Sequence, residues 1–173
     1  METSRRSFLK AGALAALVLA AGGGLYRHTH SPAPTGFVLD GEARSALHAV
    51  VPAILAGVLP TEPGQRAQAI EAATERVRQT ILGLPLATQQ EVQDLFGLLA
   101  LGPARRLLTG IPHGWPDATD GEVAAWLQDW RTHRIALLRT AYQALHDLVL
   151  GSWYSDSANW AAIGYPGPLK ELV

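Results

Sequence analysis

The stretch that decides the fold is residues 121–150, GEVAAWLQDWRTHRIALLRTAYQALHDLVL. Its apolar side chains recur every three or four residues, which places them on one face of an α-helix. They are Val123, Trp126, Leu127, Trp130, Leu137 or Leu138, Tyr142, Leu145 and Val149. Thr119 and Glu122 make a capping-box pattern before the stretch, and Gly151 follows it. The spacing predicts one long helix, with a shift of the apolar face near Thr132.

Shorter segments on the N-terminal side of this stretch have the same periodicity. Asp40 is a predicted N-cap for a helix over residues 41–60, and Pro52 inside it is predicted to kink or split that helix. Pro63 suits the first turn of a helix over 63–82. The remaining predicted helices are 88–99, opened by a Thr88–Glu91 capping box, the short 103–109, and the short 157–163.

The absence of strand patterns completes the prediction of fold class. No segment alternates convincingly with a period of two, and no Asn-Gly or Asp-Gly turn joins two candidate strands. We therefore predict an all-α, single-domain helical bundle of four to five main helices, preceded by a signal segment.

Composition excludes several classes of protein. The chain has 173 residues, a net charge of −1 and no cysteine. Without cysteine there is no disulfide framework, no thiolate-held iron–sulfur cluster and no C-type haem attachment. Without a basic excess, nucleic-acid binding has no support. About 150 residues remain after the N-terminal segment, which is enough for one domain with a real core.

The titratable residues form no recognisable catalytic or metal-binding pattern. None of the six histidines has a His-x3-His, Glu-x2-His or His-Glu-x2-His spacing, which would place two ligands on one helical face. No Gly-x-Ser-x-Gly elbow marks a nucleophilic serine. The acidic residues Glu71, Glu75 and Asp129 are predicted to pair with arginines on exposed helix faces. We therefore expect a non-catalytic chain with no metal site and no cofactor of its own.

The N-terminal segment resembles a twin-arginine export signal. The matching residues are Ser4, Arg5, Arg6, Phe8, Leu9 and Lys10, and the apolar run from 11 to 21 follows them. From 11 to 25 this run is shorter than the roughly 20 apolar residues that a membrane-spanning helix needs. The pattern predicts a signal segment over 1–22, either removed or retained as an anchor, and a linker over 23–39. The alternative is an ordinary N-terminal membrane anchor that contains two arginines.

The C-terminal tail, residues 151–173, is unusually aromatic. GSWYSDSANWAAIGYPGP places two tryptophans and two tyrosines in a segment with little helix left to bury them. Tryptophan and tyrosine combine a large apolar area with a polar group, so they are common both in cores and at interfaces. The tail must therefore pack either against its own bundle or against another chain, and the pattern favours neither.

This tail resembles the C-terminal segment of a known family. The matching residues are Trp153, Tyr154, Asp156, Trp160, Ile163, Gly164, Tyr165, Pro166, Gly167 and Pro168. Together with the helical segments ALHAVVPAILAGVLP and LQDWRTHRIALLRTAYQALHDLVLGSWY and the export signal, they are similar to the gluconate 2-dehydrogenase subunit 3 family. Its members are small, twin-arginine-tagged subunits of flavin-dependent membrane-bound dehydrogenases. The middle of the chain matches only as generic helix.

The resemblance implies a function for the whole chain. Residues 40–173 would be a helical accessory domain that binds no redox cofactor and whose tail contacts the partner. The partner would be an FAD-dependent dehydrogenase of the glucose–methanol–choline type that lacks a signal of its own. The small subunit would aid its folding and carry it through the Tat translocase, and a cytochrome c subunit would receive the electrons.

Two consequences of the resemblance concern location and assembly. The complex would be periplasmic and associated with the membrane, either through its other subunits or through an uncleaved signal segment. Some relatives have cysteines that could pair within the complex, whereas this chain has none. Association with the dehydrogenase would therefore be non-covalent.

One alternative comes from a different functional class. A free-standing periplasmic helical protein could hold a small apolar ligand or haem in its tryptophan-rich bundle. His48 or His146 would then be the axial ligand of the haem. An independent hydrolase or metal enzyme has no residue spacing in its favour.

Overall fold

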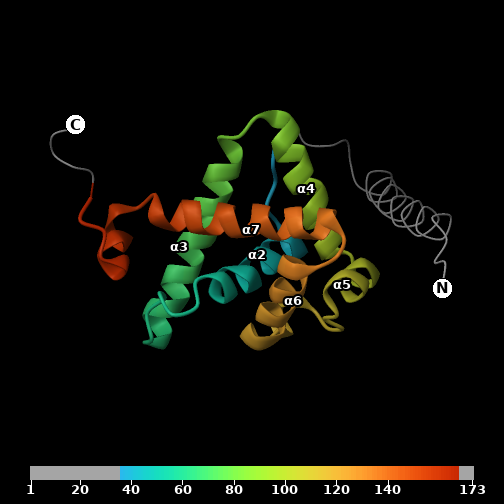
Figure 1. Ribbon diagram of the computed structural model, residues 1–173, viewed down its shortest axis with the longest axis horizontal. Coiled ribbons are helices and arrows are strands. Elements are labelled where there is room, and N and C mark those ends of the chain that lie inside the picture. The colour runs from blue at the N-terminus through green and yellow to red at the C-terminus, as the bar shows by residue number, and fades with distance from the viewer. Residues whose placement is uncertain (1–35, 168–173) are drawn as a thin grey trace.

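The computed structural model describes residues 36–167, apart from the side chains of residues 161 and 162, and these residues fold as an all-α bundle (Figure 1). The α-helices are α2 (Gly41–Ile54), α3 (Pro63–Leu82), α4 (Leu86–Ala100), α5 (Gly102–Thr109), α6 (Asp120–Thr132) and α7 (Ala136–Tyr154). Two 3₁₀ helices, η1 (Trp115–Asp117) and η2 (Ser157–Ile163), complete the described elements, and no strand occurs among them. The predicted fold class is confirmed.

Helix α2 is the centre of the bundle. It packs against α3, α4, α6, η1 and α7. Its side chains Ala46, Leu47, Val50 and Val51 have no exposed surface at all. Burial of this kind is what holds a bundle of amphipathic helices together, because isolated short helices are marginal in water. In Figure 1, α7 crosses α3, and the tail that follows α7 lies on the opposite side of the bundle from α5.

The predicted long helix over 121–150 is wrong in one respect: it is two helices. His133 adopts an extended conformation with ψ of 145°, and its Nδ1 accepts the N–H of Ile135 at 3.1 Å. The guanidinium of Arg139 donates to the carbonyl of His133 at 2.6 Å. These bonds stabilise a corner that lets α6 pack on α2 while α7 packs on α3.

Some of the predicted helix starts are confirmed and others are not. The Thr119–Glu122 capping box forms, and Pro63 occupies the first turn of α3. Asp40 is the N-cap of α2, although its side chain makes no capping bond, and α2 ends at Ile54, two residues after Pro52. The Thr88 capping box is wrong, because α4 already begins at Leu86 after Pro85.

Three tryptophans form a connected cluster in the core beside α2. The rings of Trp115 and Trp126 are 5.4 Å apart, and those of Trp126 and Trp130 are 5.0 Å apart in an edge-to-face arrangement. The indole N–H of Trp115 donates to the carbonyl of Leu99, and that of Trp130 donates to the carbonyl of Leu108. The cluster therefore fixes α5, η1 and α6 relative to one another.

Candidate functional site

The predicted export signal cannot be placed in the structure. Ser4, Arg5, Arg6, Phe8, Leu9 and Lys10 lie outside the described residues. Within residues 36–167, no helix combines the length and the apolar character that crossing a membrane requires. The same residues contain no group of three or more histidine or acidic side chains arranged to hold a metal ion.

The beginning of the C-terminal tail belongs to the core rather than to the surface. Trp153 is buried at the end of α7, and Ser152 beside it donates from its hydroxyl to Thr80 of α3 at 2.9 Å. Tyr154 is half-buried against the same core. Trp153 is therefore not accessible to a partner in this conformation, and the predicted partner surface must begin further along the chain.

An ion pair attaches the tail to α3. Asp156 accepts from the guanidinium of Arg76 at 2.5 Å, and both side chains are about one-third exposed. The other carboxylate oxygen of Asp156 accepts the N–H of Ala158 at 2.9 Å, which opens η2. Asp156, predicted as a partner-binding residue, thus has a positioning role within the chain.

The rest of the tail folds upon itself. The indole N–H of Trp160 donates to the carbonyl of Tyr154 at 2.7 Å, and its ring meets Tyr165 edge to face at 5.2 Å. Gly164 and Gly167 have φ of +69° and +97°, which other residues rarely adopt. A Cβ on Gly167 would also lie 3.4 Å from the Trp160 ring. These two glycines therefore permit a compact turn around Trp160.

The folded tail presents an apolar surface to solvent, which we call the tail surface and define as Ile163, Tyr165 and Pro166. Ile163 is 52% exposed and Tyr165 is 46% exposed, and Pro166 is also exposed. Of the other predicted partner-binding residues, Trp160 and Gly167 lie half-buried beneath this surface, and Pro168 lies outside the described residues. The structure thus brings Trp160, Tyr165 and Gly167 together, whereas Trp153 lies in the core.

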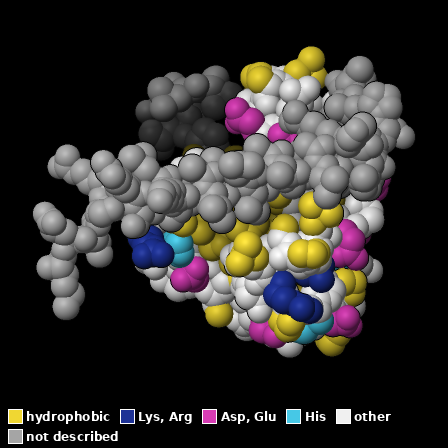
Figure 2. Space-filling view, turned by 90° about the vertical axis from the view of Figure 1, so that its right-hand side faces the viewer, with side chains coloured by type: hydrophobic (Ala, Val, Ile, Leu, Met, Phe, Trp, Pro, Cys, Tyr) yellow, Lys and Arg dark blue, Asp and Glu magenta, His cyan; other side chains and the backbone are white. Residues whose placement is uncertain are grey.

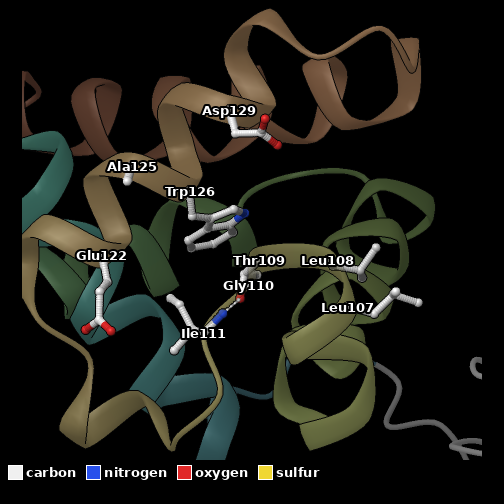
Figure 3. A pocket seen from close by; sticks show the side chains of 9 residues that line it. All are labelled: Leu107, Leu108, Thr109, Gly110, Ile111, Glu122, Ala125, Trp126 and Asp129. Atoms are coloured by element: carbon white, nitrogen blue, oxygen red, sulfur yellow. Dashed lines mark hydrogen bonds between the residues drawn. The ribbon is translucent and has the colours of Figure 1, made fainter.

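A second feature, which the sequence did not indicate, is an open groove of about 430 Å³ between the end of α5 and α6 (Figure 3). We call it the α5–α6 groove. Its lining residues are Leu107, Leu108, Thr109, Gly110, Ile111, Glu122, Ala125, Trp126 and Asp129. On the side of the molecule seen in Figure 2, hydrophobic side chains gather in the coloured area, with acidic, basic and histidine side chains around them.

A hydrogen-bonded cluster supports one wall of the groove. Glu122 Oε2 accepts the N–H and the hydroxyl of Thr119, and Glu122 Oε1 lies 3.1 Å from Nε2 of His113. These bonds, first those to Thr119 and then that to His113, lower the pKa of Glu122 to about 2. The carbonyl of Gly114, then Glu122 and Asp117, raise the pKa of His113. The loop before α6 is thus held by the contact between His113 and Glu122, which is a charged pair when His113 is protonated.

This cluster predicts how stability depends on pH. Because its pKa is raised in the folded state, protonated His113 stabilises the protein below its ordinary pKa of 6.5, and this stabilisation is lost as pH rises through the folded-state pKa. The Glu122 contribution is present above 4.5 and lost only as pH falls toward about 2. Between about pH 5.5 and about pH 8.5, the melting temperature of the unaltered protein should therefore fall more than that of His113→Gln.

Circular dichroism at the two pH values measures this difference. His48→Gln, at an exposed histidine of α2, is the matched control and should follow the unaltered protein. If His113→Gln and the unaltered protein lose melting temperature in parallel, the charged pair does not stabilise the loop.

Neither histidine considered as a haem ligand lies in the tryptophan cluster. His48 is exposed on α2. His146 contacts the ring of Tyr142 and lies 3.3 Å from a carboxylate oxygen of Asp147. The acidic pairs predicted on helix faces are present for Glu75 with Arg78 and for Glu71 with Arg44.

Comparison with known proteins adds no family assignment. The sequence matches no family model, no curated protein and no solved structure. The functional argument therefore rests on the residues of this chain.

Proposed function

We propose that this chain is a non-catalytic small subunit that binds an FAD-dependent dehydrogenase, aids its folding and carries it through twin-arginine export. The observation that carries the proposal is the tail surface of Ile163, Tyr165 and Pro166. Ile163 and Tyr165 are about half exposed, the Tyr165 ring packs on Trp160, and the Arg76–Asp156 pair attaches the start of the tail to α3. Pre-ordered apolar side chains of this kind suit a protein interface, because little conformational freedom remains to be lost on binding.

The other parts of the proposal come from the sequence. The Ser4–Lys10 pattern supplies the export signal, and the resemblance of the tail supplies the class of partner. In this proposal the FAD resides in the dehydrogenase, a cytochrome c subunit accepts the electrons, and the complex is periplasmic. This explains why a chain that would hold no cofactor has a signal for the export of folded proteins: the FAD would be in the dehydrogenase that it carries.

A mild pull-down from membranes and periplasm tests the association. The bait is the full chain with a C-terminal affinity tag, repeated with the tag in the 23–39 linker so that a blocked tail is recognised. A stoichiometric larger band with a flavin absorbance spectrum supports the proposal. A single colourless band from both versions would overturn it.

Export is tested by a separate change. Arg5→Lys with Arg6→Lys keeps the positive charge but removes the planar guanidinium groups that distinguish arginine. We expect a severalfold fall in the periplasmic fraction of this chain and of the flavoprotein together, measured by cell fractionation and immunoblotting. Arg27→Lys, in the linker, is the matched control and should leave both fractions unchanged. If the flavoprotein reaches the periplasm normally without both arginines, this chain is not its carrier.

A further inference from the structure

The two charged residues that line the α5–α6 groove are both acidic. Glu122 and Asp129 line it from α6, and no lysine, arginine or histidine lines it. The C-terminal end of α5, which carries the negative end of a helix dipole, forms the opposite wall. Among the described residues, no side chain pairs with the exposed carboxylate of Asp129, whereas Glu122 is already bonded. The groove therefore offers one free carboxylate to a cation.

Just beneath the floor of the groove is a buried hydrogen-bond donor without an acceptor. Trp126 is buried, and its indole nitrogen has no partner among the described residues. In Figure 3 this nitrogen lies on the side of the ring that faces Leu108 and Asp129. Trp115 and Trp130 in the same cluster both donate to backbone carbonyls. An unpaired buried donor is unfavourable, so Trp126 indicates a missing acceptor.

The walls of the groove are apolar, so its occupant needs an apolar part. Leu107, Leu108 and Ile111 line one side, and Leu107 is 75% exposed. A fitting occupant needs an apolar body, a positive group for Asp129 and a carbonyl for the Trp126 indole. A peptide with basic residues next to apolar residues combines all three.

We propose that the α5–α6 groove binds a basic–apolar peptide segment, and that its occupant is residues 4–10 of this same chain, Ser-Arg-Arg-Ser-Phe-Leu-Lys. In this segment Phe8 and Leu9 supply the apolar body and stand between Arg6 and Lys10. Because Glu122 is already bonded to His113 and Thr119, Asp129 is the carboxylate that would receive a cation. Arg6 and Lys10 stand on either side of the apolar pair and can supply it.

The length of chain between the segment and the folded domain permits the contact. Residues 11–35 separate Lys10 from Gly36, and a chain of that length spans up to about 80 Å when fully extended. A tethered partner also acts at a high effective concentration, of millimolar order, so weak contacts suffice. This inference rests on the proposed export function: the groove would keep the signal segment from the translocase until the segment is released.

Photo-crosslinking of the full chain tests the contact. The protein is expressed so that residues 1–35 remain, and intact mass confirms this. Benzoylphenylalanine replaces Phe8, and the dilute protein is irradiated, digested and sequenced by mass spectrometry. We expect cross-links to 107–111 or 122–129. Asp129→Asn should lower their yield by roughly two- to fivefold, the range for one partly exposed ion pair. Trp126→Phe should also lower it, and circular dichroism reports whether each variant is folded.

Glu91→Gln, at an exposed carboxylate of α4, is the matched control and should leave the yield unchanged. Cross-links elsewhere on the chain would overturn the proposal. So would cross-links to the groove whose yield is the same in Asp129→Asn as in the unaltered protein. A cross-linked species of doubled mass would assign the groove to a second chain, and a small molecule co-purified in the groove would assign it to a ligand; either would also overturn it. The cross-linking assay contains no flavoprotein. A failed pull-down therefore counts against binding of the dehydrogenase, and a failed cross-link counts against binding of the signal segment in the groove.

Discussion

Replacing Trp115 with alanine should remove a large part of the stability of the fold. Its ring is 1% exposed, contacts Trp126 and lies under the guanidinium of Arg105, 5.8 Å from the ring centre. Truncating a buried tryptophan costs about 3–5 kcal/mol, against a total of about 5–15 kcal/mol for a typical domain. Chemical denaturation followed by circular dichroism should show a large fall in the free energy of unfolding.

Two further variants identify the reason for this loss. Trp115→Phe keeps a ring but leaves the Leu99 carbonyl without its indole donor, which should cost about 1–3 kcal/mol. Trp160→Ala, the matched control, removes a half-buried tryptophan whose contacts lie within the tail, and should cost only about 1 kcal/mol. If Trp115→Ala is no less stable than Trp160→Ala, the tryptophan cluster is not the support of α5, η1 and α6.

The sequence predicted those features that depend on neighbouring residues. Apolar periodicity identified the helices, and the Thr119–Glu122 box formed because both of its bonds lie within one turn. The Thr88 box failed for a long-range reason. Gln89, one residue later, donates to the carbonyls of Leu82 and Leu84 and accepts the N–H of Phe37. That buried amide ties three segments together and belongs inside α4.

The corner at His133–Ile135 could not be predicted from composition. It contains neither glycine nor proline. The bond from the Ile135 N–H to the His133 ring, the bond from Arg139 to the His133 carbonyl and the separate packing of α6 and α7 explain it. Trp153 was predicted at a partner surface because the family resemblance included it and because Gly151 was expected to end the helix. The structure continues α7 to Tyr154 and so buries Trp153.

The groove was missed for a related reason. Glu122, Ala125, Trp126 and Asp129 follow helical spacing, so Trp126 was assigned to the core together with Trp130. Only the folded structure shows that one indole nitrogen of the cluster lacks an acceptor and that the end of α5 leaves space beside it. An acidic residue on each side of a tryptophan at this spacing is the signal that could have suggested it.

Ile163→Asp and Tyr165→Asp should each abolish association with the dehydrogenase while leaving the fold intact. Both side chains are about half exposed, so the folded chain tolerates the charge, whereas an interface would have to desolvate a carboxylate without a partner. Loss of a central interface residue costs about 2–4 kcal/mol, which is roughly 30- to 1,000-fold in affinity. The measurement is flavin absorbance per mole of captured chain, with circular dichroism to confirm folding.

Leu86→Asp is the matched control for this prediction, because Leu86 is a 62% exposed apolar residue at the start of α4. In Figure 1, α4 lies apart from the tail. It should retain the full flavin signal. Asp156→Asn separates contact from positioning: it weakens the pair with Arg76 but changes no residue of the tail surface. It should lower the flavin signal less than Tyr165→Asp does, since the interface residues remain and only their prior ordering is reduced. Equal flavin recovery with Tyr165→Asp and Leu86→Asp would move the interface away from the tail.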